Sequence, residues 1–159
     1  MSKAFTSDSD GDDIFIEPPA LPPGVINYMT VAGAKKLQAE IDNLMSERSH
    51  VGSDIKGSDR AQSIERRLRY LLPRRDAMQA INPLSQPKDR VLFGASVTIS
   101  DDKSHQETWR IVGLDEVDLD RGWISWMSPL ASALLDKKVG DDILFRSQHL
   151  TILSIRYEA

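Results

Sequence analysis

The sequence contains no cysteine, so disulfide bonds and thiolate metal ligands are both excluded. Its 159 residues are only 6% aromatic, and no apolar run approaches the ~18 residues that could span a membrane. The glycine-loop motifs Gly-x-x-x-x-Gly-Lys and Gly-x-Gly-x-x-Gly are absent, which leaves nucleotide binding without support. His50, His105 and His149 are scattered and show no metal-ligand spacing. The sequence therefore predicts no catalytic constellation, no metal site, no cofactor and no membrane partner.

An excess of positive charge is also missing. The formal net charge is -4, whereas a protein whose main partner is free DNA or RNA needs a positive surface. Arginine is nevertheless concentrated in one segment, which contains Arg66, Arg67, Arg69, Arg74 and Arg75. This basic patch is either a solvated helix face balanced by acidic residues or a surface that contacts RNA phosphates. The N-terminus is acidic and polar, unlike a signal peptide, so a cytoplasmic protein is predicted.

Residues 1–28 are predicted to form a flexible leader. Asp8, Asp10, Asp12 and Asp13 alternate with serine and glycine, and four prolines follow before Gly24. Proline prevents regular helix and favours extended backbone. A calcium loop at Asp8–Asp13 is rejected, because it lacks the bidentate glutamate at position twelve and the flanking helices.

Residues 29–82 are predicted to form an antiparallel helical hairpin, a short coiled coil. Thr30 is a suitable N-cap for a helix that begins at Val31. Apolar residues then recur at steps of three and four, interrupted by a polar turn around Gly52–Asp59. Two amphipathic helices joined by a short turn bury their apolar sides best against each other. Pro73 predicts a kink or break near Leu72.

Residues 83–90 form a predicted linker to a second domain at residues 91–159. Strands are expected over 91–99, 107–114, 122–127, 142–145 and 150–157, with a turn at Asp101–Ser104. A helix is expected over 130–138, because Pro129 suits a first turn and Gly140 a helix end. The fold class is therefore α+β, with a helical hairpin followed by an antiparallel sheet that carries one helix.

Three segments of the second domain resemble a known family. They are Arg-Ile-Val-Gly-x-Asp-Glu at Arg110–Glu116, Ile-Ser-x-x-Ser-Pro-Leu-Ala at Ile124–Ala131, and Ala-Leu-Leu-x-Lys-x-Val-Gly-Asp at Ala133–Asp141. In order and spacing they resemble the C-terminal domain of the bacterial Gre transcript-cleavage factors, GreB-like members in particular. The resemblance implies an FKBP-like domain that binds the rim of the RNA polymerase secondary channel. It places Asp115, Glu116, Ser128, Pro129 and Leu130 on the polymerase-binding side.

The hairpin departs from that family. The Gre factors carry an acidic tip that holds a second Mg²⁺ at the polymerase active site, where the metal activates water for RNA cleavage. Between the matching arm segments, this chain is shorter than a GreB-type hairpin by about seventeen residues, or ~13 Å of reach when shared between two arms. Of the tip only Asp54 and Asp59 remain, and both also suit ordinary turn chemistry.

The sequence thus predicts a transcription regulator that binds the polymerase secondary channel without stimulating cleavage and competes with true Gre factors. It is expected not to be an enzyme. An active cleavage stimulator is the alternative, in case Asp54 or Asp59 still reaches the active site. A prolyl isomerase is the other alternative, although the aromatic residues are spread along strands rather than gathered in a pocket.

Overall fold

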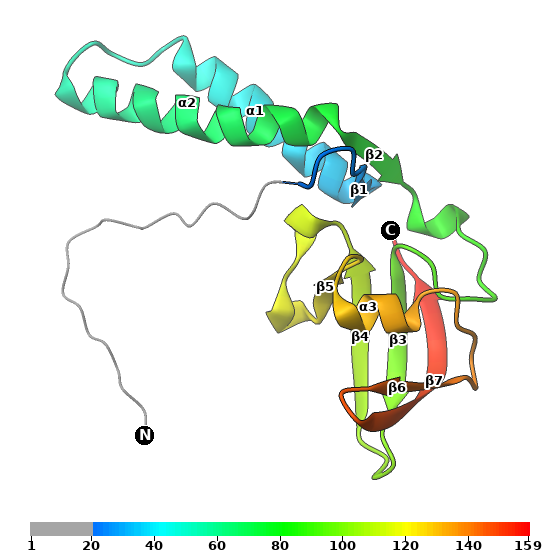
Figure 1. The fold of residues 1–159 in the computed structure, drawn as a ribbon. Helices are drawn as coiled ribbons and strands as arrows, with labels where there is room; N and C mark the ends of the chain where they lie inside the picture. Colours follow the sequence, from blue (N-terminus) through cyan, green and yellow to red (C-terminus); the bar gives the residue numbers. More distant parts are fainter. Residues whose placement is uncertain (1–20) are drawn as a thin grey trace, which may run out of the picture.

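The structure, a computed structural model, describes residues 21–159, so the predicted leader lies mostly outside the described residues. A helical hairpin extends from a sheet domain (Figure 1). The elements of the hairpin region are β1 (Asn27–Thr30), α1 (Val31–Arg48), α2 (Ile55–Asp76), β2 (Met78–Ile81) and the 3-10 helix η1 (Pro83–Ser85). Those of the sheet domain are β3 (Ala95–Ser100), β4 (Gln106–Val112), η2 (Leu114–Glu116), η3 (Leu119–Arg121), β5 (Trp123–Ser125), α3 (Pro129–Leu134), β6 (Asp142–Phe145) and β7 (Gln148–Tyr157).

The predicted α+β class is confirmed, with the helical pair preceding the sheet. Thr30 caps α1 as expected, since its side chain accepts a hydrogen bond from the Gly33 amide at 3.0 Å. The two helices pack through the apolar residues that the three-and-four spacing indicated. The buried ones are Ala34, Leu37, Ile41, Ile64, Leu68 and Leu71.

The turn between the helices is shorter than predicted, because α2 begins at Ile55 and includes Gly57 and Asp59. Asp54 explains the earlier start, since its carboxylate accepts a hydrogen bond from the Gly57 amide at 2.7 Å and caps the helix. A Cβ on Gly57 would overlap the carbonyl oxygen of Gly52. Glycine is therefore required for the close approach of backbone to backbone at this tip.

The expected break at Leu72 does not occur, because α2 runs through Pro73 to Asp76. Pro73 lies in the last turn of the helix, where its ring removes a single backbone donor. The helix ends regularly after it, with the Ala77 amide donating to the Pro73 carbonyl at 3.1 Å. A bend of the helix axis at this point stays a prediction.

A parallel pair of short strands, β1 and β2, joins the two ends of the hairpin and was not predicted. Asn27 lies opposite Met78, and Thr30 lies opposite Ile81. Asn27 is fully buried, and its backbone amide donates a hydrogen bond to the Ala77 carbonyl at 2.8 Å. The pair closes the open end of the hairpin and fixes where both helices begin and end.

The sheet domain has the strand order β5-β4-β3-β7-β6, in which β4 and β5 pair in parallel and the other neighbours antiparallel. β3 alternates buried and half-buried residues along its length, as a central strand with one covered face does. The helix of this domain, α3, lies over the sheet (Figure 1) and buries Ala131 and Leu134 in the core. Helix α3 ends four residues earlier than predicted, because Asp136 adopts a left-handed conformation (φ 66°) soon after it.

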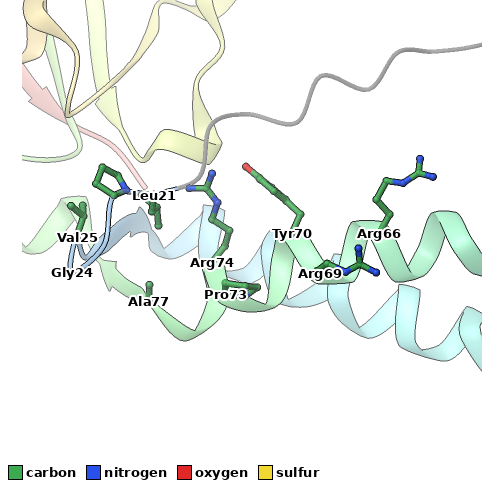
Figure 2. Close-up of a pocket in the computed structure, with 10 residues that line it drawn as sticks. Leu21, Gly24, Val25, Arg66, Arg69, Tyr70, Pro73, Arg74 and Ala77 are labelled. Carbon is green, nitrogen blue, oxygen red and sulfur yellow. The ribbon is translucent and has the colours of Figure 1, made fainter.

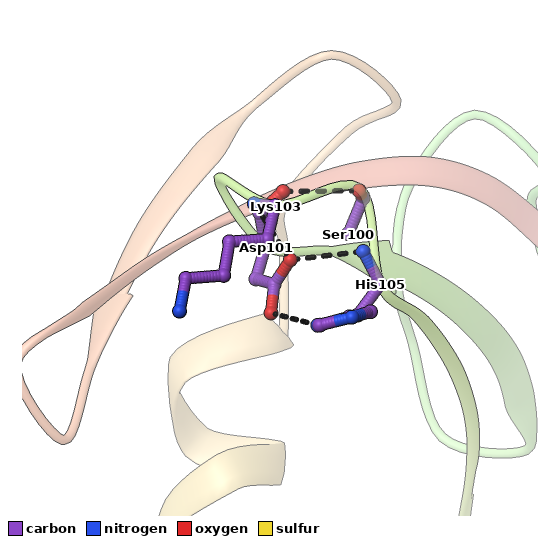
Figure 3. A network of polar contacts seen from close by, with 4 residues as sticks. All are labelled: Ser100, Asp101, Lys103 and His105. Atoms are coloured by element: carbon purple, nitrogen blue, oxygen red, sulfur yellow. Dashed lines mark hydrogen bonds and ion pairs between the residues drawn. The ribbon is translucent and has the colours of Figure 1, made fainter.

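The predicted turn at Asp101–Ser104 joins β3 to β4, and Figure 3 shows Asp101 at its centre. The Asp101 carboxylate accepts hydrogen bonds from the amides of Lys103 and His105, both at 2.9 Å. The His105 amide, more than any other group, lowers the pKa of Asp101. Among residues 21–159, no helix is long and apolar enough to cross a membrane.

Candidate functional site

Glu116 connects the sheet domain to the base of the hairpin. Its carboxylate accepts hydrogen bonds from the Thr30 amide at 3.0 Å, from the Thr30 hydroxyl, and from the Gly113 amide at 2.8 Å. A Cβ added to Gly33 would overlap this carboxylate, and one added to Gly113 would overlap the Tyr28 carbonyl. Two glycines thus leave the room that lets a carboxylate from η2 reach the start of α1.

Asp115, the neighbour of Glu116, binds the other helix of the hairpin. It accepts a hydrogen bond from the Tyr70 hydroxyl at 2.9 Å and lies 3.8 Å from Nε of Arg74. The side chains of Arg74 and Asp115 are only 4% and 15% exposed. Burial, followed by the hydrogen bond to the Asp115 carboxylate, raises the pKa of Tyr70 to about 12. Asp115 and Glu116 together hold both helices to the sheet domain.

These contacts change the role expected of the two carboxylates. They were predicted to face the polymerase, but both side chains are directed to the hairpin base and engaged there. The sequence held no signal for this, since 86 residues separate Thr30 from Glu116 and 45 separate Tyr70 from Asp115. The other three residues of the predicted surface lie at the start of α3.

Ser128 caps α3, because its hydroxyl accepts a hydrogen bond from the Ala131 amide at 3.2 Å. Pro129 opens the helix and is exposed, whereas Leu130 packs partly against the core. Met127 beside them is a further exposed apolar residue, at 40% exposure. The loop before α3 therefore presents an apolar surface that Asp115 and Glu116 do not share.

The predicted basic patch does not form one surface. Arg74 is buried, at 3% exposure, and lies over the ring of Tyr70 at 4.7 Å. Arg67 pairs with Glu40 of α1 at 2.6 Å, and Arg75 lies 3.4 Å from its neighbour Asp76. Arg66 and Arg69, which lie along α2 in Figure 2, are exposed and have no acidic partner among residues 21–159. The patch is thus reduced from five arginines to two, because helical spacing turns the others inward or toward acidic partners.

The tip carries Asp54 and Asp59. The Asp54 carboxylate is the N-cap of α2, and Asp59 is exposed on the second turn of that helix. Below the tip, Arg60 pairs with Glu47 through two hydrogen bonds of 2.6 and 2.7 Å, which lower the pKa of Glu47. Across residues 21–159, no group of three or more acidic or histidine side chains is arranged to hold a metal ion.

Comparisons with known proteins identify a family for this chain. The family model described as "Transcription elongation factor, GreA/GreB, C-term" matches residues 86–157. Transcription elongation factor GreB of Neisseria meningitidis serogroup B (strain MC58) is 33% identical over 82% of this chain and 94% of its own length. GreA of Nitratidesulfovibrio vulgaris (strain DP4) is 34% identical over 81% of this chain and 92% of its own. A solved GreA/GreB factor from Nitrosomonas europaea is 17% identical, with a TM-score of 0.42, over 84% of this chain and 99% of that one.

The chain thus consists of a hairpin and a sheet domain that are held together through η2. Its relatives identify it as a transcription factor. The chain belongs to the GreA/GreB family of transcription elongation factors, and it is GreB-like. As a family member it is an RNA polymerase-binding regulator of transcription. This membership gives no support to the prolyl-isomerase alternative.

The expectation that the chain is not an enzyme is wrong as a flat statement. Its relatives are GreA and GreB factors, which stimulate cleavage of the RNA transcript by RNA polymerase.

Proposed function

We propose that the chain docks at the rim of the polymerase secondary channel through its sheet domain and fills the channel with its short hairpin. In that position it competes with full-length Gre factors and does not itself stimulate transcript cleavage. The observation that carries this proposal is the short hairpin. Of its two tip carboxylates, Asp54 lies nearer the turn and is engaged in capping α2. Since bacterial polymerase works in the cytoplasm, the proposal places the chain there.

The length of the hairpin supports the absence of stimulation. Helices of 18 and 22 residues measure about 27 and 33 Å at 1.5 Å per residue. The alignment with the Neisseria GreB is 153 positions long, but it includes only 82% of the 159 residues of this chain, or about 130. About twenty aligned positions are therefore residues of the relative that this chain lacks. We assign them to the hairpin, because family-like segments flank it on both arms. Shared between two arms, they correspond to about 15 Å of reach.

The chemistry of the tip supports the same conclusion. An inner-sphere Mg²⁺ bond requires a carboxylate oxygen at ~2.1 Å, so a shortfall of several ångströms removes it. Asp54 would also have to leave the Gly57 amide to bind a metal, at the expense of the α2 cap. Asp59 is not held by any hydrogen bond or ion pair among the described residues, but it lies a turn further from the tip.

Docking is assigned to the loop before α3, where exposed Met127 and Pro129 form an apolar surface. Asp115 and Glu116 contribute to docking by setting the direction in which the hairpin leaves the sheet domain. Arg66 and Arg69 are the residues available for contact with RNA phosphates. Binding of polymerase should fall in Pro129→Asp, whereas Pro87→Asp, a change of an exposed linker proline, should leave it unaltered.

The function is tested on stalled, backtracked elongation complexes. The chain alone should leave the rate of RNA cleavage at its intrinsic value, and increasing concentrations should inhibit cleavage stimulated by a full-length GreB. Asp54→Asn and Asp59→Asn should inhibit equally well, because occupancy of the channel needs no tip carboxylate. Accelerated cleavage by the chain, abolished by either substitution, would show instead that the short hairpin reaches the active site.

A further inference from the structure

The N-terminal segment is the one motif of the sequence that the proposed function does not use. Its acidic residues are Asp8, Asp10, Asp12, Asp13 and Glu17, against a single basic residue, Lys3. Ile14, Phe15 and Ile16 follow the aspartates directly. A segment with carboxylates at one end and an apolar run at the other is complementary to a surface that has cations beside an apolar hollow.

Such a surface exists where the chain emerges into the described part of the molecule. A cavity of about 440 Å³ separates residues 21–25 from α2 (Figure 2). Its lining is apolar at one end and cationic along the helix: Leu21, Pro22, Gly24, Val25, Arg66, Arg69, Tyr70, Pro73, Arg74 and Ala77. Arg66 and Arg69 are exposed and form no hydrogen bond or ion pair with any residue of the described range 21–159.

The tether makes an intramolecular partner favourable. Leu21 itself lines the cavity, and Asp13 precedes it by eight residues, which span at most ~28 Å when extended. Along α2, Arg66 lies only ~10 Å from Pro73 at the other end of the cavity. A tether long enough to span the two sites makes docking intramolecular and raises the effective concentration, so even weak ion pairs populate the docked form.

We propose that the acidic segment Asp8–Asp13 docks in cis on Arg66 and Arg69, with the Ile14–Ile16 run at the adjoining cavity. The segment then acts as an internal polyanion that covers the arginine face of α2 and competes with RNA for it. The assignment to this segment rests on charge, on the hollow beside it and on the tether. Two acidic groups near these arginines, Glu65 and Asp115, are already engaged: Glu65 pairs with Arg48 at 3.1 Å, and Asp115 binds Tyr70 at the hairpin base.

The absence of cysteine allows a direct test on the full chain. A nitroxide attached to Ser9→Cys should broaden the amide signals of α2 around Arg66 and Arg69 at 50 mM salt. The broadening should disappear in Arg66→Gln/Arg69→Gln and at 0.5 M salt, where charges are screened within a few ångströms. The matched control is Lys35→Gln/Lys36→Gln, which removes two exposed cations from α1 and should leave the broadening intact.

A second readout measures the covering of the arginines. Replacing Asp8, Asp10, Asp12 and Asp13 by asparagine should tighten binding of a fluorescent single-stranded RNA about fivefold at 50 mM salt. In the Arg66→Gln/Arg69→Gln background the same replacement should have no effect. Broadening that survives the arginine substitutions, or RNA affinity that the asparagines leave unchanged, would overturn the proposal. Neither readout involves polymerase, so the inference stands or fails independently of the proposed function.

Discussion

The base and the tip of the hairpin are built by different interactions. At the base, carboxylates from the sheet domain reach buried or half-buried partners on both helices: Glu116 meets Thr30, and Asp115 meets Tyr70 and Arg74. At the tip, the contacts are local or exposed, as in the Asp54 cap and the Arg60–Glu47 pair. A buried polar contact is costly to leave unsatisfied, whereas exposed ion pairs contribute little. The base therefore determines the direction of the hairpin, and the tip only completes it.

The largest effect is expected at Glu116. Glu116→Ala removes the acceptor for three donors at the base, so the free energy of unfolding should fall by about 3 kcal/mol. This corresponds to a loss of about 8 °C in Tm for a chain of this size. Thermal unfolding followed by circular dichroism measures it. Asp120→Ala, a change of an exposed acidic residue in the same region, is the control. Equal Tm values for the two variants would remove the distinction between base and surface.

Tyr70 should give a smaller effect that depends on pH. Tyr70→Phe removes the donor to Asp115 and should lower the free energy of unfolding by about 1 kcal/mol at pH 7. The pKa of Tyr70 is raised to about 12 in the folded state, so its stabilisation is complete below pH ~10 and is lost as the pH rises toward 12. Urea titrations should therefore show the wild type and the variant converging between pH ~10 and ~12. Tyr28→Phe, which alters no hydroxyl hydrogen bond within residues 21–159, should show no such convergence.

The cap at Asp54 tests the tip itself. Asp54→Ala should lower the free energy of unfolding by about 1 kcal/mol, the usual value for an N-cap, and Asp54→Ser should restore most of it. Chemical denaturation compares the three chains. A Ser variant as unstable as the Ala variant would mean that the Asp54 charge, rather than its cap, stabilises the tip.

The smallest effect is expected at the exposed ion pair below the tip. Arg60→Gln breaks the pair with Glu47, yet Tm should stay within experimental error of the wild type at both 50 and 500 mM salt. A Tm that fell clearly at low salt and recovered at high salt would show that this exposed pair stabilises the tip.

Periodicity and capping residues predicted the elements of this fold well. Thr30 marked the start of α1, and apolar residues such as Ile41 and Leu68 marked the buried sides of the two helices. The β1–β2 pair escaped prediction, because four-residue segments carry no alternation long enough to recognise. The roles of Asp115 and Glu116 escaped it for another reason, since both depend on contacts between residues far apart in the chain. The five arginines looked equivalent in sequence, and they are separated by the burial of Arg74 and by the acidic partners of Arg67 and Arg75.

The parallel pairing of β1 and β2 bears on how the length of this hairpin can change. Because the two strands bracket the hairpin at its base, helical turns can be deleted or inserted in equal number on both arms without disturbing a single residue of the bracket. A deletion of seven residues per arm shortens the reach by about 10 Å and keeps the apolar sides of the helices facing each other. Hairpin length thus behaves as an independent evolutionary variable. A chain built in this way can change the reach of its hairpin while keeping one unchanged attachment to the sheet domain.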